Sequence, residues 1–101
     1  MDFKVIISQP AINDLENIVS YIATHDSDAA GRMGMELLKR TRVLSSFPEI
    51  GRRAPEADAP DIREIIYRSY RIFYRVKLEH RVVEVIRFWH GARGFPVIPS
   101  P

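Results

Sequence analysis

Two kinds of hydrophobic periodicity divide this sequence. After a short β-branched and aromatic run at residues 2–7, apolar residues recur every three or four positions up to about Thr24, and again up to Ser46. That spacing is typical of an amphipathic helix, and Ser8 followed by Pro10 is a favourable helix start. The sequence therefore predicts a strand and then two helices, which the short HDSD segment joins as an antiparallel hairpin.

From Ile62 to His90 the pattern changes to alternation. Tyr70, Ile72 and Tyr74 point one way along a predicted strand, and the residues between them point the other way. Turn-forming breaks near residues 68–69 and 79–81 divide the segment into about three strands. Because the breaks are short, these strands are expected to form an antiparallel meander.

The predicted fold class is α+β, in the order β-α-α-β-β-β, with a helical hairpin packed on one face of a small, mainly antiparallel sheet. Residues 1–101 are expected to form one domain, because the chain is too short for two. The segment 47–61 has three prolines and a glycine, so it is expected to be an irregular surface connection. The tail from about residue 94 is also expected to be irregular.

Composition removes several classes of function. The chain has no cysteine, no apolar run near the roughly 20 residues needed to span a bilayer, and no signal-peptide pattern at its start. We therefore expect a soluble, cytoplasmic protein that does not insert in a membrane. The five glycines form no phosphate-binding motif, and no serine lies in a nucleophile elbow. The three histidines lie in different elements, so neither a metal nor a cofactor is expected.

Charge is unevenly distributed along the chain. Residues 1–50 hold five Lys/Arg and seven Asp/Glu, whereas residues 51–101 hold ten Lys/Arg and six Asp/Glu. Nine of those ten basic residues are arginines, whose planar donors suit carboxylates and phosphates. An acidic partner for the second part of the chain is therefore a physically reasonable expectation.

The strand arginines are the main candidates for a binding surface. Alternation places Arg71, Phe73 and Arg75 on one face, and the pleat could bring Arg63 and Arg87 to the same face. His90 and Arg93 are expected at its rim. Such a patch suits an RNA backbone, a phosphoryl transition state or the carboxylates of a protein partner. The alternative is an ordinary solvated face of a half-covered sheet.

The segment FWHGARG ends the last predicted strand and contains His90 and Arg93. A histidine there can transfer protons in ribonucleolytic cleavage, or it can bond a backbone carbonyl and fix the turn into Gly91. For a single histidine at a strand end, we favour the second role. Arg93 is then expected at the edge of the sheet, where its role would be recognition.

Six segments cover nearly the whole chain: the opening strand, AINDLENIVSYIA, FPEIGRR, IREI, SYRIFYRV and VIRFWHGAR. Together they resemble the RelE/ParE superfamily of type II toxins from bacterial toxin–antitoxin modules. The resemblance implies a helical hairpin packed on a small antiparallel-dominated sheet. FPEIGR and RFWHGAR look more like the ParE or plasmid-stabilisation branch than the RelE branch.

The two branches imply different activities. ParE-like members poison DNA gyrase, whereas RelE-like members cleave mRNA in the ribosomal A site with clustered Lys and Arg and a late Tyr or His. By this resemblance Arg71 matches the strand arginine of the ribonucleases, Arg63 lies near their first basic strand residue, and His90 or Arg93 lies near their C-terminal catalytic position. Glu64 and Ile65 stand where those nucleases have further basic side chains.

The leading hypothesis is a ParE-like toxin that poisons DNA gyrase and assembles with a cognate antitoxin as a hetero-oligomer. The candidate binding residues for antitoxin or target are Arg63, Arg71, Phe73, Arg75, Arg87 and Arg93. The alternative is a metal-independent endoribonuclease acting on the ribosome and its mRNA, with Arg63, Arg71, His90 and Arg93 as its catalytic candidates. A further alternative is a non-toxic protein-binding module.

Overall fold

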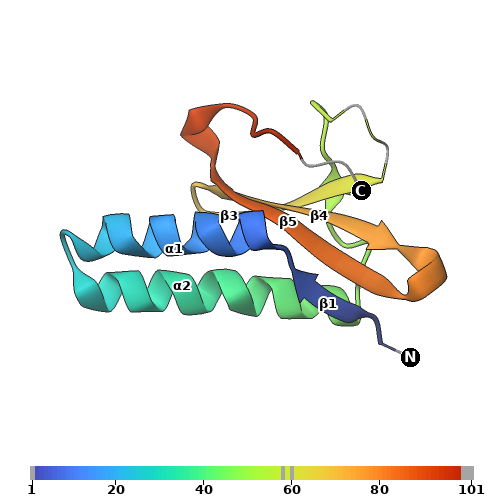
Figure 1. Cartoon of the computed structure of the whole chain (residues 1–101), viewed down its shortest axis with the longest axis horizontal. Helices are drawn as coiled ribbons and strands as arrows, with labels where there is room; N and C mark the ends of the chain where they lie inside the picture. The colour runs from blue at the N-terminus through green and yellow to red at the C-terminus, as the bar shows by residue number, and fades with distance from the viewer. Residues whose placement is uncertain (1, 58, 60, 99–101) are drawn as a thin grey trace.

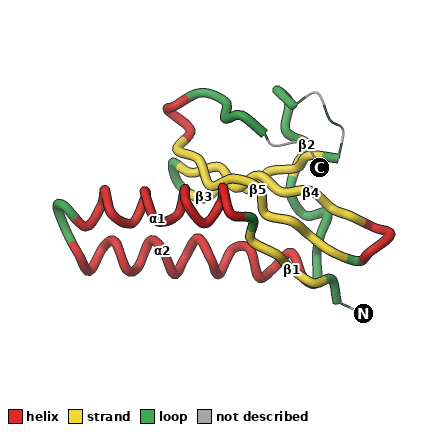
Figure 2. Tube along the Cα trace, viewed as in Figure 1, coloured by secondary structure: helices red, strands yellow, loops and turns green. Residues whose placement is uncertain are grey.

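A pair of helices covers one face of a mixed five-stranded sheet (Figures 1 and 2). The computed structural model describes residues 2–57, 59 and 61–98. The helices and strands in chain order are β1 (Lys4–Ile7), α1 (Gln9–Ala23), α2 (Ser27–Arg42), β2 (Arg52–Arg53), β3 (Ile62–Tyr67), β4 (Tyr70–Lys77) and β5 (Val82–His90). Three single-turn 3-10 helices are η1 (Val43–Ser45), η2 (Leu78–His80) and η3 (Gly91–Arg93).

Both helices begin at side-chain caps that the sequence supplies. The Ser8 hydroxyl accepts a hydrogen bond from the backbone N–H of Ala11, and the Asp26 carboxylate accepts one from Ala29. Three basic residues in the last turn of α2 complement the negative end of its dipole. In the described part of the chain, neither helix combines the length and apolarity that a membrane crossing needs.

The sheet has the strand order β1-β5-β4-β3-β2. Strands β2 to β5 pair antiparallel with their neighbours, whereas β1 pairs parallel with β5 through Lys4–Val82 to Ile7–Val85. The β3–β4 and β4–β5 turns contain Arg68 and Arg81 at positive φ, 53° and 51°. The helical hairpin separates β1 from the other strands in sequence, yet β1 is the edge strand beside β5, the last strand of the chain.

A bulge in the β4–β5 pairing changes which side chains face the helices. Phe73 lies opposite Arg87 and Tyr74 lies opposite Val85, so Ile86 is an extra residue in β5. Val85 and Phe88 therefore both pack toward the helices, while Ile86 packs on the other side. Arg87, which strict alternation from Val85 would have turned toward the helices, lies opposite Phe73 on the outer face.

Two hydrophobic clusters lie on opposite faces of the sheet. The inner cluster joins the helices to the sheet and consists of Ala11, Leu37, Leu44, Ile72, Tyr74, Val83, Val85 and Phe88. The outer cluster consists of Ala54, Ile62, Phe73 and Ile86, with Trp89, Phe95 and Ile98 among the residues packed against it. The connection before β3 and the tail after β5 thus cover the face that the helices leave open (Figure 1).

The predicted fold class is confirmed, with corrections in detail. The expected irregular connection contains the short strand β2, so the sheet has five strands rather than four. The first strand begins at Lys4 instead of residue 2, and α2 ends at Arg42, where η1 continues to Ser45. The tail is irregular from 94 to 98 as expected, but it packs on the sheet instead of leaving it. Residues 58, 60 and 99–101 lie outside the described part.

Gly51 lies directly before β2, at a position where the neighbouring atoms leave no room for a side chain. An added Cβ would lie 2.5 Å from the Glu64 carbonyl oxygen and 2.6 Å from the Tyr74 hydroxyl oxygen. The same hydroxyl accepts a hydrogen bond from the Gly51 N–H at 2.8 Å. We expect Gly51→Ala to lower the free energy of unfolding by about 1–3 kcal/mol, because backbone and a buried ring must move.

Gly31→Ala is the matched control for that substitution. An added Cβ at Gly31, within α2, would meet nothing within 4 Å. We expect this substitution to raise the free energy of unfolding by up to about 1 kcal/mol through helix propensity. Urea unfolding of both variants measures the difference, and equal effects of the two substitutions would contradict the argument.

Candidate functional site

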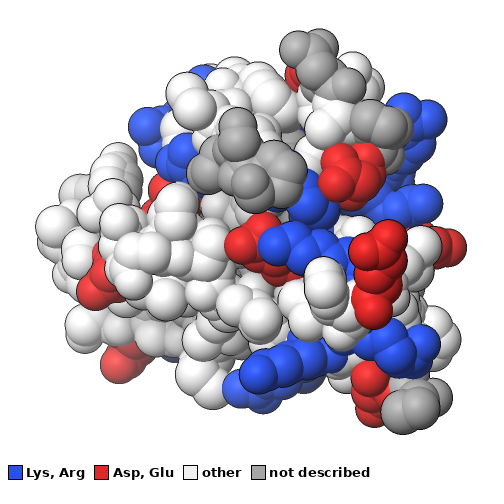
Figure 3. Space-filling view, turned by 45° about the vertical axis from the view of Figure 1, so that its right-hand side comes forward, with Lys and Arg blue, Asp and Glu red and all other residues white. Residues whose placement is uncertain are grey.

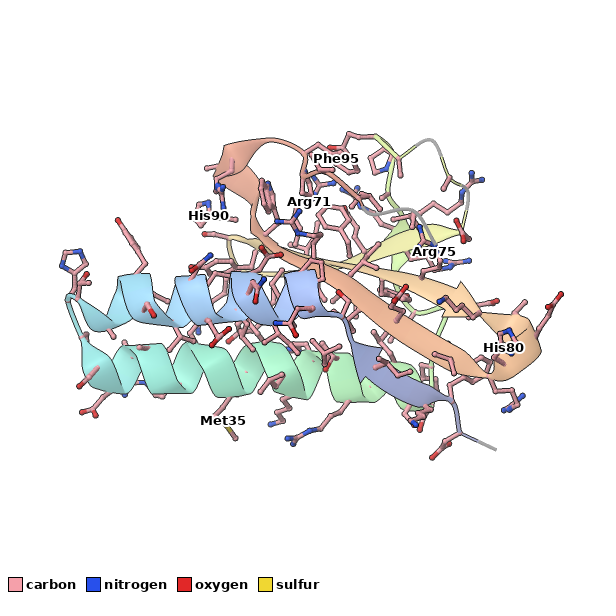
Figure 4. All side chains as sticks on the ribbon, in the orientation of Figure 1. Met35, Arg71, Arg75, His80, His90 and Phe95 are labelled. Carbon is pink, nitrogen blue, oxygen red and sulfur yellow. The ribbon has the colours of Figure 1, made fainter. Side chains whose placement is uncertain are left out.

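The outer face of the sheet, away from the helices, carries most of the predicted site residues. Arg71, Phe73 and Arg75 alternate outward along β4, and Arg87 joins them because of the β5 bulge. Figure 4 places Arg71 and Arg75 on this side, with Phe95 of the tail close above Arg71. These four residues therefore start from one face of the sheet, although the Arg87 guanidinium reaches Asp14 of α1. That this face is a binding surface stays a prediction.

Arg63 does not join that face, and this part of the prediction is wrong. Arg63 lies opposite Tyr74, whose ring belongs to the inner cluster. Its guanidinium donates to the backbone carbonyl oxygens of Gly51 at 2.7 Å and Glu49 at 3.4 Å. The reason is register: Glu64 takes the outward position opposite Phe73, so its neighbour must point the other way.

A network of two arginines and two glutamates, Arg52, Glu56, Glu64 and Arg71, occupies the centre of the outer face. The Glu64 side chain is 0% exposed. Its Oε1 accepts from Arg52 Nε at 2.9 Å, and its Oε2 accepts from Arg71 Nε at 3.0 Å and also from Arg71 Nη2. Both oxygens of a fully buried carboxylate are thus matched by charged donors, which offsets the cost of removing the charge from water.

Glu56 closes the network from the solvent side. Its two carboxylate oxygens accept from Arg71 Nη2 at 2.8 Å and from Nη1 at 3.0 Å, a paired arrangement of parallel hydrogen bonds. The hydrogen bond with Arg71 lowers the pKa of the Glu56 carboxyl below its ordinary value. The hydrogen bonds with Glu56 and then Glu64 raise the pKa of Arg71.

Aromatic rings enclose the Arg71 guanidinium from two sides. Its central carbon lies 4.8 Å from the centre of the Phe73 ring and 5.8 Å from that of Phe95. The two rings contact each other edge to face at 5.3 Å. These contacts and its four hydrogen bonds to carboxylates leave the Arg71 side chain 13% exposed.

The other outward arginines are also held by carboxylates of this chain. Arg75 Nε donates to Asp61 at 3.1 Å, and its Nη1 lies 3.6 Å from Glu84. Arg87 donates to both oxygens of Asp14 in α1, at 2.7 and 2.8 Å. The expected face of unpaired cations is therefore internally neutralised. Figure 3 shows blue and red side chains interspersed on one view of the surface.

Asp14 was not among the predicted residues, yet it joins α1 to the sheet. Besides holding Arg87, its carboxylate accepts a hydrogen bond from the backbone N–H of Phe88 at 3.1 Å. Phe88 lies beyond the end of the β1–β5 pairing, so the carboxylate satisfies an edge that no strand covers. The hydrogen bond to Asp14 raises the pKa of Arg87.

His90 and Arg93 border a groove beside α1. The His90 Nδ1 accepts a hydrogen bond from the Ala92 N–H at 3.1 Å, so this histidine holds the turn as predicted, but its partner is a backbone amide instead of the expected carbonyl. Arg93 stacks over the Trp89 ring at 4.0 Å. The groove has a volume of about 470 Å³, and its mainly apolar lining includes Ile18, Tyr21 and Tyr70. A wider groove of about 960 Å³ lies between α2 and the β3–β4 turn.

Three of the important residues carried a weak sequence signal. Glu64 is a charged residue at an alternating position within a strand, and Glu56 and Arg52 lie in a segment without periodicity. Only the pairing of β3 with β4 brings Glu64 beside Arg71. In the part of the chain that the structure describes, no three His, Asp or Glu side chains gather as a metal site would require.

Solved structures share this architecture. The RelBE2 toxin–antitoxin complex of Mycobacterium tuberculosis aligns with a TM-score of 0.70 at 20% identity, covering 89% of this chain and 99% of that one. The chromosomal ParDE system of P. aeruginosa aligns with a TM-score of 0.74 at 16% identity, covering 87% and 95%. A mutant of the E. coli toxin RelE in the free state aligns with a TM-score of 0.66 at 22% identity, covering 93% of this chain and 88% of that one. The fold is that of the RelE/ParE toxins.

Sequence comparison gives the family. Toxin RelE1 of Caulobacter vibrioides is 31% identical over 93 residues, covering 90% of this chain and 96% of that protein. A family model described as "ParE toxin of type II toxin-antitoxin system, parDE" matches residues 5–95. The chain belongs to this ParE toxin family, within the RelE/ParE superfamily of type II toxins.

The Asp14 contacts predict a measurable loss of stability. Asp14→Asn keeps the size of the side chain but removes the charge that Arg87 faces, leaving a half-buried guanidinium with a poorer partner. We expect the free energy of unfolding to fall by about 1–3 kcal/mol. Glu16→Gln on the exposed side of the same helix is the control, with an expected change within about 0.5 kcal/mol. Equal effects in urea unfolding would show that Asp14 does not join α1 to the sheet.

Proposed function

We propose that this toxin acts as ParE-like toxins do, by poisoning DNA gyrase, and that it does not cleave RNA. The observation that carries this proposal is the state of Arg71, the residue that matches the strand arginine of the ribonucleases. Four hydrogen bonds from Arg71 end on Glu56 and Glu64. A guanidinium so occupied has little capacity left to stabilise the charge that develops on a phosphate.

The remaining ribonuclease candidates do not converge. Arg63 bonds backbone carbonyls on the helical face, and the His90 Nδ1 is occupied by a backbone amide. General acid–base catalysis requires the proton-transferring group within hydrogen-bond reach of a substrate that the cations also hold. The separation of Arg63 from Arg71 on two faces of the sheet argues against such an arrangement.

Ribosome-dependent cleavage of mRNA stays as the second candidate because of one observation. The relative that is 31% identical over most of both chains is named Toxin RelE1, and RelE-like members of the superfamily are ribonucleases. Arg93 is also exposed just after the end of β5, where it could contact a polyanion.

The partner that we propose is a cognate antitoxin, forming a hetero-oligomer with this chain. The solved relatives include toxin–antitoxin complexes. The groove beside α1 is lined by the exposed Tyr21 and by partly exposed apolar side chains, and Arg93 borders it, which fits an amphipathic helix with an acidic flank. Apolar contacts would supply most of the affinity, and Arg93 would steer association in a salt-dependent way.

Induction of the protein in a bacterial host, with DNA and RNA read out side by side, tests the proposed activity. We expect growth to stop, gyrase-dependent DNA breaks to accumulate, and cellular mRNA to stay uncut in primer-extension maps. Codon-positioned cuts that persist in a gyrase-inhibitor-resistant host and vanish in Arg93→Ala would establish the ribonuclease instead. Unchanged growth would mean that the chain is a binding module without toxicity.

The α1 groove gives a separate prediction about the antitoxin. Tyr21 lines the groove and is 65% exposed, so Tyr21→Ala removes contact area with little effect on the fold. We expect the affinity for the antitoxin encoded beside the toxin to fall at least about tenfold, as for an interface hot spot. Ile12→Ala, on an exposed part of α1 that does not line the groove, is the control. Titration calorimetry compares the two, and equal losses would place the antitoxin elsewhere.

A further inference from the structure

The network of Arg52, Glu56, Glu64 and Arg71 resembles a binding site for a phosphate or carboxylate group that a side chain of this protein already fills. Arg71 presents its two outer nitrogens to Glu56 in the paired geometry that guanidinium also uses for phosphate. Arg52 reaches the same network from β2, and its side chain is 61% exposed. We propose that Glu56 occupies a phosphate-binding position formed by Arg71 and Arg52, and that this carboxylate keeps phosphate groups off the outer face.

The two glutamates have different roles in this arrangement. Glu64 is a fixed counterion, because it is fully buried in a central part of β3 and both its oxygens are bonded by arginines. Removing it would leave two guanidinium groups without the charge that holds them on the sheet. Glu64 therefore belongs to the construction of the site, and it cannot be its exchangeable occupant.

Glu56 has the properties of an exchangeable occupant. It lies in the connection between β2 and β3, its side chain is 44% exposed, and only Arg71 holds its carboxylate among the described residues. Because this carboxylate is partly exposed, water can replace its hydrogen bonds when it leaves Arg71. Its attachment to the chain nevertheless gives it a high effective concentration, which keeps dilute external anions out.

Charge counting gives the same conclusion. Arg52 and Arg71 carry two positive charges, and Glu64 neutralises one of them. Without Glu56 the network would have one unbalanced positive charge, Arg71 Nη1 would lose its carboxylate acceptor, and Nη2 would keep only Glu64. Phe73 and Phe95 border this position with apolar rings, which limit hydration and strengthen the attraction for an anion.

The alternative is that Glu56 is an ordinary surface partner whose loss opens no binding site. The two explanations differ for Glu56→Gln, which keeps the side-chain size but removes the competing charge. Glu79→Gln is the matched control, since it makes the same change of net charge at an exposed residue of η2 in the β4–β5 turn. Any gain from net charge alone must be equal in the two variants.

Binding of a fluorescein-labelled single-stranded RNA oligonucleotide by the purified full-length protein is measured by anisotropy. We expect Glu56→Gln to bind at least about tenfold more tightly than the wild type, and Glu79→Gln to stay within about twofold, since one distant surface charge is screened. The double variant Glu56→Gln/Arg52→Gln should lose most of the gain. Thermal unfolding of each variant checks that it is folded.

A second arm uses inorganic phosphate against chloride at equal ionic strength. We expect phosphate to raise the melting temperature of Glu56→Gln but not that of the wild type or Glu79→Gln, because a ligand of the folded state stabilises it. A selective gain with either probe supports the site and identifies whether free phosphate or a polyanion fills it. Equal behaviour of Glu56→Gln and Glu79→Gln with both probes overturns the proposal, as does Arg52-dependent RNA binding by the wild type. Neither result depends on whether gyrase is the target of the toxin.

Discussion

The neutralisation of Glu64 is the interaction on which the outer face of this protein depends. A carboxylate with no exposed surface carries a desolvation cost of several kcal/mol unless charged donors surround it. Here two arginines from β2 and β4 supply those donors, and they fix the edge of the sheet and its centre in one arrangement. In the described part of the chain, every buried side-chain polar atom has a hydrogen-bond partner.

This constraint explains why two irregular segments lie on the sheet. The outer face carries the apolar side chains of Ile62, Phe73 and Ile86 beside these charges. Because the charges are paired, chain can pack over the apolar side chains without burying an unpaired charge. The connection contributes Ala54, and the tail contributes Phe95. The Trp89 indole N–H donates to the Gly94 carbonyl, and Arg87 donates to the Val97 carbonyl, so the tail is held by polar contacts as well. The result is three layers: the helical hairpin, the sheet, and the irregular connection and tail.

The same fold can therefore present chemically different faces within one superfamily. Arginines on a sheet bind phosphate only if their donors are free, and here the chain supplies its own carboxylates to them. The helical side has a different character. The groove beside α1 is lined mainly by apolar side chains, whereas the wider groove beside α2 mixes apolar and charged side chains. Our two proposals thus place recognition of a protein partner and binding of phosphate groups on different sides of the molecule.

The sequence by itself determined the elements, because caps, helical periodicity and strand alternation are local properties of consecutive residues. It also placed Arg71 and Phe73 together, since residues two apart on a strand share a face. Only the tertiary structure decided which charged side chains share the outer face, and therefore whether its arginines are neutralised. The bulge at Ile86 turned Arg87 outward, and the pairing of β3 with β4 set Glu64 beside Arg71 while turning Arg63 away. Those outcomes depend on register between strands, which no periodicity within a single segment encodes.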